Sequence, residues 1–188
     1  KPLRHGDVVH VRGELASVED KSSGRLASYR LFGFVDGELA IEGTTGFFVR
    51  AATRGEKKAA GTSDSAPGEP DLVVEQHVDS DQASRYAVAS GDDNPIHTSD
   101  ETAKSAGLPG VILHGLCTMA LAQRDLVDRL AGGDPTRLKR LGVRFAKPVF
   151  PGETLTLQAW TDGEDVRFET RNSSGATVIS NGVARIVD

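Results

Sequence analysis

The most regular feature of the chain is an apolar stripe at helical spacing between about His114 and Leu130. One face of this segment carries apolar side chains, namely Leu116, Met119, Ala120, Leu126, Val127 and Leu130. The opposite face carries Arg124, Asp125, Asp128 and Arg129. The pattern predicts one long amphipathic helix that buries its apolar face.

Short runs of alternating apolar and polar residues surround this helix. One run, "DLVVEQHV" from Asp71, precedes it, and four follow it: "LKRLGVRFAKPV", "ETLTLQAW", "DVRFETRN" and "ATVISNGVARIV". Alternation of this kind is typical of β-strands with one buried face. A long helix with several antiparallel strands packed on it is an α+β layer arrangement, which is the fold class we expect.

Two short helices are predicted between the first strand and the long helix. In "SDQASRYAVAS", either Asp79 or Ser80 is placed to cap the helix N-terminus, and Gly91 is placed to end the helix. In "TSDETAKSAG", Thr98 and Glu101 have the spacing of a capping box.

The N-terminal part of the chain resembles the last strands of the C-terminal part. "HGDVVHVRG" aligns with "PGETLTLQA", so that Gly6 matches Gly152 and Asp7 matches Glu153. "SSGRL" then matches "SSGATV", and "GELAIEGTTGFFVRA" occupies the place of "ATVISNGVARIVD". Three matches in one order favour an internal repeat, although β-hairpins also converge on Gly- and Ser-rich turns.

A segment of small, charged, Pro- and Gly-containing residues, 52–70, separates the two parts. We expect it to be a linker or a mobile loop. Residues 1–51 would then form the strands of a partial first repeat, and residues 71–188 a complete domain. The chain begins at Lys1 rather than at Met, which suggests processing or a fragment of a longer polypeptide.

Composition narrows the class of protein and its partners. Hydrophobic residues make up 38% of the 188 residues and charged residues 26%, as in globular proteins. The net charge of −5 argues against a nucleic-acid partner, and no apolar run approaches the ~20 residues that cross a membrane. The single cysteine, Cys117, excludes an internal disulfide and a cysteine-based zinc site, so we expect a cytoplasmic protein.

The stretch "SGDDNPIH" holds the first candidates for chemistry, Asp92 and His97. Pro95 disfavours a helical conformation at Asn94, so the chain between the pair stays extended. A neutral imidazole beside a carboxylate can hold one water and exchange protons with it. Taken singly, Asp92 would be a turn residue, and His97 would be a structural histidine at a helix start whose hydrogen bonds are made within the fold. Together they favour catalysis.

The stretch "VILHGL" places His114 and Gly115 at the start of the long helix. Backbone N–H groups at a helix N-terminus can bind negative charge that develops on a carbonyl oxygen, and glycine lets that carbonyl come close. Gly115 could equally serve only to let the helix start against a strand. Asp92, His97 and His114 are also metal-ligand types, but they lack a tight ligand spacing, so we predict no metal site.

The stretch "YAVASGDDNPIHTSDETAKSAGLPGVILHGLCTMA", from Tyr86 to Ala120, resembles the signature of R-specific enoyl-CoA hydratases and MaoC-like dehydratases. The resemblance implies the hot-dog fold, in which a curved antiparallel sheet wraps a long helix, here as one complete and one partial repeat. It also implies reversible hydration of a trans-2-enoyl-CoA to the (3R)-hydroxyacyl-CoA. No metal or organic cofactor is implied, because coenzyme A belongs to the substrate.

Residue by residue, the resemblance assigns the catalytic pair to Asp92 and His97, and the N–H that polarises the thioester carbonyl to Gly115. Asn94 matches a supporting residue of the motif. Our candidate substrate-binding residues are Asn94, His114 and Lys147. Lys147 belongs to a basic group, with Lys139, Arg140 and Arg144, that could meet the phosphates of coenzyme A or simply be solvated.

Two other functions stay open beside the hydratase. A non-catalytic hot-dog subunit would bind acyl thioesters or complete a heteromer, and a hot-dog thioesterase would use the same N–H donor to hydrolyse its substrate. Unlike two-repeat hydratases, this chain lacks the front of the first repeat, so its pocket could need another polypeptide. We expect a homodimer or pairing with another hot-dog chain, because an incomplete sheet exposes its edges.

Overall fold

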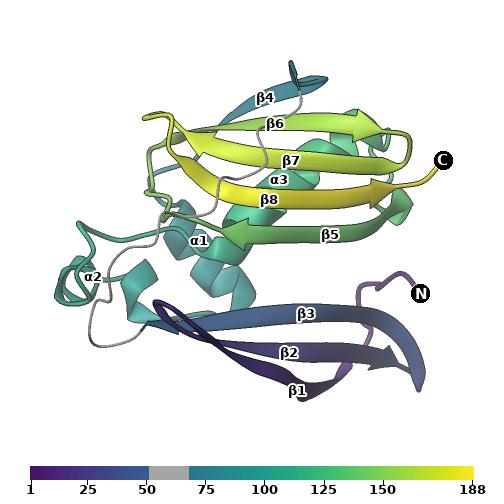
Figure 1. Cartoon of the computed structure of the whole chain (residues 1–188), viewed down its shortest axis with the longest axis horizontal. Helices are drawn as coiled ribbons and strands as arrows, with labels where there is room; N and C mark the ends of the chain where they lie inside the picture. Colours follow the sequence, from purple (N-terminus) through teal and green to yellow (C-terminus); the bar gives the residue numbers. More distant parts are fainter. Residues whose placement is uncertain (51–67) are drawn as a thin grey trace. The chain divides into compact units, whose positions relative to one another are not determined.

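The computed structural model of the chain describes residues 1–50 and 68–188. The chain divides into two compact units, Lys1–Thr62 and Ser63–Asp188, and each unit has its own sheet (Figure 1). The predicted linker at residues 52–70 lies outside the described residues except for residues 68–70. Its mobility and the exact domain boundaries therefore stay predictions. None of the described helices is both long enough and apolar enough to span a bilayer.

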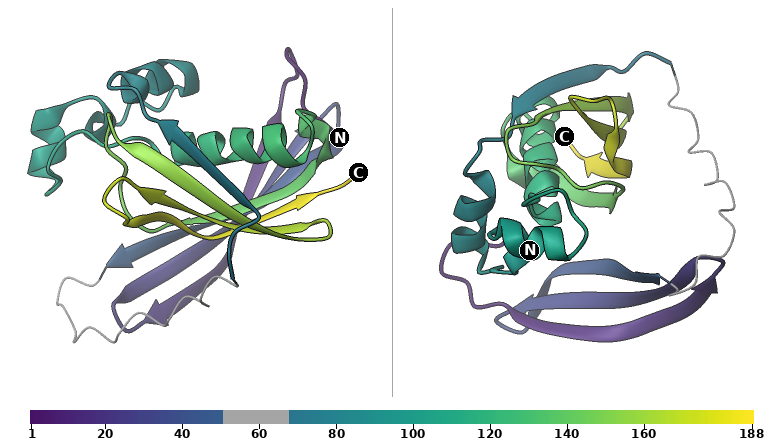
Figure 2. Two further views of the ribbon diagram at one scale, coloured as in Figure 1. Left: turned by 90° about the horizontal axis from the view of Figure 1, so that it is seen from above. Right: turned by 90° about the vertical axis from the view of Figure 1, so that its left-hand side faces the viewer.

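The second unit is one antiparallel sheet packed on one long helix. Helix α3 covers Gly115–Leu130, and the strand order of the sheet is β4-β6-β7-β8-β5. The strands are β4 (Leu72–His77), β5 (Leu138–Phe145), β6 (Thr154–Asp162), β7 (Asp165–Asn172) and β8 (Thr177–Ile186). The sheet curves around α3 (Figure 1, Figure 2). The predicted α+β hot-dog fold is confirmed.

The main core of this unit lies between α3 and the inward faces of the strands. Leu126 and Val127 of α3 pack with Leu157, Phe168 and Ile179 of β6, β7 and β8. Strand side chains alternate between the two faces of a sheet, so every second residue of these strands meets the helix. A second apolar cluster joins the sheet to the first turn of α3 and to the short helix that precedes the candidate site.

The buried face of α3 differs from the predicted stripe. Leu116 is 62% exposed and Ala120 is exposed, whereas Cys117, Thr118 and Asp125 are buried. The prediction was wrong at the first turn. There Cys117 packs into the second apolar cluster, and Leu116 faces solvent.

The burial of Asp125 has a consequence for stability. Its side chain pairs with Arg124 at 3.3 Å through Oδ1, while Oδ2 is buried and has no partner among the described residues. Burial is the main cause that raises the pKa of Asp125 above its ordinary value of 3.8. The folded state therefore binds this proton more tightly than the unfolded state. As a result, Asp125 lowers the free energy of unfolding as pH rises from 3.8 towards the raised value.

We expect the free energy of unfolding of Asp125→Asn, relative to that of the wild type, to increase as pH rises through this window. Below the window the difference should not change with pH. Urea unfolding at a series of pH values measures the difference. Asp128→Asn is the matched control, because Asp128 lies on the same helix and is exposed. A difference between Asp125→Asn and the wild type that stays constant with pH would contradict the assignment.

Three short helical segments precede α3, and a fourth follows it. They are α1 (Gln82–Ser90), the 3-10 turn η1 (Pro95–His97), α2 (Asp100–Ser105) and, after α3, the 3-10 turn η2 (Pro135–Arg137). The predicted N-caps of α1 and α2 are wrong by one or two residues, whereas Gly91 ends α1 as predicted.

The N-cap of α1 is Asp81, and no side chain caps this helix, because the carboxylates of Asp79 and Asp81 both pair with Arg85. For α2, η1 extends through His97 and moves the start of the next helix onward. Ser99 is therefore the N-cap of α2, and its Oγ accepts the N–H of Thr102 at 3.3 Å.

The first unit is a three-stranded antiparallel sheet in the order β1-β2-β3, formed by β1 (His10–Lys21), β2 (Gly24–Val35) and β3 (Glu38–Arg50). The order matches that of β6-β7-β8. The turns before β1 and β6 also agree in detail, since Gly6 has φ 92° and Gly152 has φ 90°. Asp7 accepts the N–H of Arg4 at 2.8 Å, and Glu153 accepts the N–H of Phe150 at 2.9 Å. These features support the first of the three predicted repeat matches.

The second of the three matches is wrong. Ser22–Gly24 connects the first strand of its sheet to the second, whereas Ser173–Gly175 lies between β7 and β8. Tight turns favour Ser and Gly wherever they occur, so this likeness reflects turn chemistry and not descent from one repeat.

One face of the first unit's sheet is rich in exposed apolar side chains. The register of the strands places Val11, Val18, Ile41 and Phe47 on the same face, and each is at least 50% exposed. Exposed apolar surface of this kind favours association. The predicted homodimer, or pairing with another hot-dog chain, stays a prediction.

Candidate active site

The loop between α1 and η1 holds Asp92 in a defined conformation. Gly91, with φ 73°, ends α1 in the left-handed region. Asp92 Oδ1 accepts the N–H of Asn94, and Asn94 Oδ1 accepts the N–H of Ile96, both at 3.3 Å. Two successive side-chain-to-backbone bonds therefore fix the loop, and Asp92 and Asn94 remain exposed.

His97, the last residue of η1, is 8% exposed. Its Nδ1 lies 2.8 Å from the carbonyl oxygen of Ile112. A carbonyl oxygen can only accept a hydrogen bond, so Nδ1 carries the hydrogen. In the neutral ring the other nitrogen, Nε2, is then the one that can accept a proton.

His114, the N-cap residue of α3, is 1% exposed. Its Nε2–H donates to the backbone carbonyl of Asp92 at 2.9 Å. Its ring stacks on the ring of His97 with centroids 3.8 Å apart and 24° between the planes. The Tyr86 ring packs on His114 from α1, with centroids 4.9 Å apart. The loop that carries Asp92, the turn that carries His97 and the start of α3 thus meet at the imidazole of His114.

Asp92, His97 and His114 each offer a side-chain oxygen or nitrogen, and these atoms lie within 4.8 Å of one another. One water making two hydrogen bonds of ~2.8 Å can bridge such a distance. The same residues are of metal-ligand type, but nearly parallel stacked rings direct their in-plane lone pairs side by side. A tetrahedral ion needs lone pairs that converge at ~2.1 Å, so the arrangement suits a water better than a metal.

Gly115 is the first residue of α3, and its N–H precedes the helical hydrogen bonds, which begin with Thr118 N–H to His114 O at 3.1 Å. A Cβ atom at position 115 would lie 3.3 Å from three ring atoms of Phe145. The Phe145 ring, 47% exposed, therefore occupies the space that a side chain would need. Glycine at this position therefore lets an aromatic ring pack against the backbone at the start of α3.

A cleft of about 360 Å³ opens beside His97. Its walls come from the start of α1, from Thr98 and Asp100, from residues 110–111 and from Phe150 and Pro151. Asp100 ties two of these walls together, because its Oδ1 accepts the N–H of Val111 at 3.0 Å. This bond is the main reason why its pKa is lowered. Of the predicted site residues, His97 alone lines this cleft.

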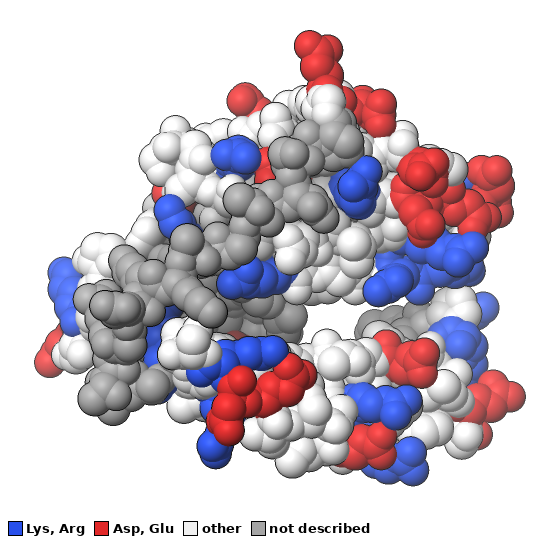
Figure 3. Space-filling view, viewed as in Figure 1, with Lys and Arg blue, Asp and Glu red and all other residues white. Residues whose placement is uncertain are grey.

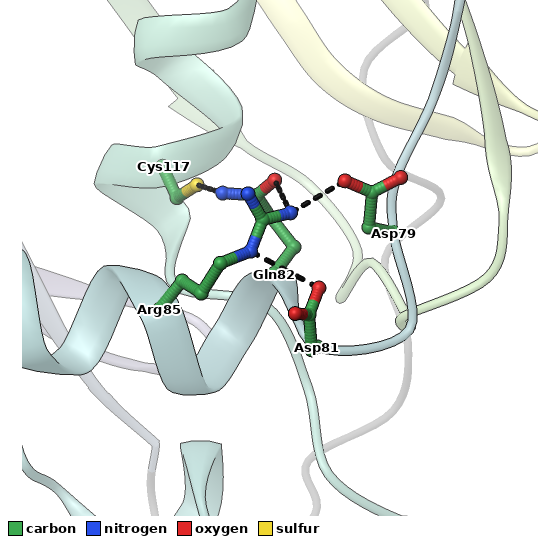
Figure 4. A network of polar contacts seen from close by, with 5 residues as sticks. All are labelled: Asp79, Asp81, Gln82, Arg85 and Cys117. Carbon is green, nitrogen blue, oxygen red and sulfur yellow. Dashed lines mark hydrogen bonds and ion pairs between the residues drawn. The ribbon is translucent and has the colours of Figure 1, made fainter.

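A polar network surrounds the start of helix α1, and one contact joins it to the first turn of α3 (Figure 4). Arg85 donates to Asp79, Asp81 and Gln82, and the Gln82 amide contacts the sulfur of Cys117 at 3.9 Å. Burial raises the pKa of the Cys117 thiol, so this residue is a packing group and not a nucleophile. Tyr86 lies on the same helix, and burial raises the pKa of its phenol.

The predicted basic group lies on the surface. Lys139, Arg140, Arg144 and Lys147 are all exposed, and Lys147 does not line the described cleft. In the view of Figure 3, positive and negative side chains are interspersed. Contact of the basic group with phosphates of coenzyme A stays a prediction, as do the roles assigned to Asn94 and Lys147.

Sequence reasoning missed three contributors: Tyr86, the carbonyl of Ile112 and the ring of Phe145. Tyr86 had a local signal, because it shares a helix face with the buried residues Ala83 and Ala87. The other two had none. Their contacts with His97 and Gly115 join residues that are far apart in the chain.

The chain is similar to known proteins over its whole length. The family described as "MaoC like domain" matches residues 62–182. The 3-hydroxyacyl-thioester dehydratase Y of Mycobacterium tuberculosis is 36% identical over 202 residues, which cover 99% of this chain and 69% of that protein. A probable enoyl-CoA hydratase 2 of Dictyostelium discoideum is 37% identical over 171 residues, which cover 89% of this chain.

Solved structures agree with these relatives. Full-length peroxisomal multifunctional enzyme type 2 from Drosophila melanogaster has a TM-score of 0.89 at 30% identity, covering 100% of this chain and 35% of that one. A MaoC-like dehydratase from Phytophthora capsici has a TM-score of 0.86 at 31% identity, covering 96% of this chain and 62% of that one. The chain spans 54% of the Dictyostelium protein and 26% of mouse peroxisomal multifunctional enzyme type 2. As its loop motif predicts, the chain belongs to the MaoC-like family.

Proposed function

We propose that the chain catalyses the reversible hydration of a trans-2-enoyl-CoA to the (3R)-hydroxyacyl-CoA. The observation that carries the proposal is the approach of Asp92, His97 and His114 side-chain atoms within 4.8 Å, next to the helix start at Gly115. The relatives named above are an enoyl-CoA hydratase and a 3-hydroxyacyl-thioester dehydratase. These names describe the two directions of one reaction.

In the proposed mechanism, the Gly115 N–H binds the thioester oxygen of the substrate. This hydrogen bond stabilises the negative charge that develops there as the β-carbon is attacked. Glycine at this position leaves room only for the Phe145 ring, so a bulkier residue would compete with that ring for the space beside the N–H.

A water held by Asp92 and His97 supplies the hydroxyl group. Its oxygen forms a bond to the β-carbon while one of its protons passes to the Asp92–His97 pair. A proton from the pair is then delivered to the α-carbon on the same face, which restores the pair and completes the addition of one water. His97 is suited to this exchange because its Nδ1 is engaged by Ile112 and its Nε2 is left for the water.

No metal or organic cofactor takes part in this scheme, since the protein groups and one water supply every proton. We therefore expect that incubation with EDTA, followed by gel filtration, leaves the rate of hydration unchanged. Loss of activity that zinc or another divalent ion restores would contradict this part of the proposal.

The decisive experiment adds the purified protein to a short trans-2-enoyl-CoA and follows the loss of the conjugated enoyl-thioester absorbance. Chiral analysis of the product is expected to give the (3R) alcohol. A thiol reagent added in parallel detects any free coenzyme A, and the buried Cys117 adds little background.

The other outcomes separate the remaining functions. Release of thiol without formation of the alcohol would mean a thioesterase. Binding of the enoyl-CoA by a folded chain without any turnover would mean a non-catalytic acyl-thioester-binding subunit. Either result would overturn the proposal.

A further inference from the structure

We infer that His114 is a positioning residue that holds the catalytic Asp92–His97 pair in place and does not itself contact substrate. The kinetic part of this inference rests on the proposed function, whereas its structural part does not. Two separate contacts carry it, one to each member of the pair.

The first contact fixes the loop of Asp92. The Nε2–H of His114 donates to the backbone carbonyl of Asp92 at 2.9 Å, and this bond links the N-cap of α3 to the exposed loop after α1. The other hydrogen bonds of the loop are local, each joining residues two to four apart. The bond from His114 is thus the one that ties Asp92 to the long helix and to the core behind it.

The second contact fixes the ring of His97. The two imidazoles stack with centroids 3.8 Å apart, while the Ile112 carbonyl holds Nδ1 of His97 in the plane of its ring. A hydrogen bond in the plane and a ring against the face together restrict both rotation and tilt of His97. Tyr86 packs against His114 in turn, so His114 cannot move away without disturbing α1.

The burial of His114 argues against direct contact with substrate. The residue is 1% exposed, its Nε2 is engaged, and its Nδ1 is enclosed without a partner among the described residues. A group that binds substrate would need an accessible polar atom. His114 therefore acts through its two neighbours, and its loss should lower kcat and leave KM nearly unchanged.

Three substitutions separate the two contacts. His114→Gln keeps an N–H near the position of Nε2 and removes the stacked ring. His114→Phe keeps the ring and removes the N–H, and His114→Leu removes both. We expect kcat to fall about 10²-fold for His114→Leu, as is usual for a misplacement of ~1 Å at a catalytic group, and less for the other two. Thr170→Val is the control, because Thr170 is 2% exposed and its hydroxyl also has no partner in the described part of the chain.

A double-mutant cycle distinguishes positioning from a general loss of folding. In a His97→Ala background, His114→Gln should cause little further loss of kcat, because it removes only the stacked ring and the imidazole that this ring positions is already absent. Equal losses in both backgrounds, or a rise in KM at unchanged kcat, would overturn the inference.

A second readout does not depend on turnover. Long-range 1H–15N spectra of the imidazole rings should show His97 as one fixed Nδ1–H tautomer in the wild type. In His114→Leu the unsupported His97 ring should lose its bond to the Ile112 carbonyl part of the time and give a tautomer mixture. The His97 signals are assigned by their absence in His97→Gln. An unchanged His97 tautomer in His114→Leu would overturn the inference even if the wild type proved inactive towards enoyl-CoA, which would instead refute the proposed function.

Discussion

Asp92→Asn is expected to lower kcat for hydration of a short trans-2-enoyl-CoA by about 10²- to 10⁴-fold, the usual contribution of a positioned acid–base group. An amide cannot take or return the proton of the attacking water. It still has a carbonyl oxygen to accept the N–H of Asn94, so the turn at this loop should be retained. Steady-state rates from the loss of enoyl-thioester absorbance measure the effect.

Asp93→Asn provides the matched control for this prediction. It makes the same chemical change one residue further along the same loop, at an exposed carboxylate. We expect its kcat to equal that of the wild type. Equal losses in Asp92→Asn and Asp93→Asn would mean that loop charge matters and that Asp92 has no specific role. Full activity in Asp92→Asn would remove this residue from the mechanism.

Leu126→Ala is expected to lower the free energy of unfolding of the second unit by about 2–5 kcal/mol. Leu126 is completely buried, at 0% exposure, where α3 packs on the sheet. The substitution removes apolar contacts and leaves a cavity that a close-packed core fills only in part. Trp160, the only tryptophan of the chain, lies in β6 at 9% exposure, so its fluorescence during urea unfolding reports on this unit.

Leu116→Ala makes the same chemical change on the same helix at a site that is 62% exposed. Its free energy of unfolding is expected to stay within about 0.5 kcal/mol of the wild type. The two residues belong to one apolar stripe in the sequence, so the pair tests the buried face found in the structure. Comparable destabilisation by both substitutions would show that the helix buries the predicted stripe after all.

Local patterns predict most of the second unit. Helical spacing of apolar residues predicts α3 from His114 to Leu130, within one residue of its observed start and at its observed end. Alternating runs predict the five strands of the sheet, because the two faces of a strand meet different surroundings. The turn chemistry of Gly91 and Pro95, together with the spacing of Asp92 and His97, is enough to locate the candidate site. These features depend on neighbours within a few residues, and the sequence shows those neighbours directly.

The tertiary structure decided the features that depend on distant residues. The Ile112 carbonyl selects the tautomer of His97, the Asp92 carbonyl receives the N–H of His114, and the Phe145 ring fills the space beside Gly115. Burial of Asp125 and exposure of Leu116 likewise follow from how α3 is rotated against two apolar clusters. Periodicity indicates that a helix has an apolar side. Which residues of that side are buried, and which polar atoms meet, depends on packing between segments that sequence spacing does not relate.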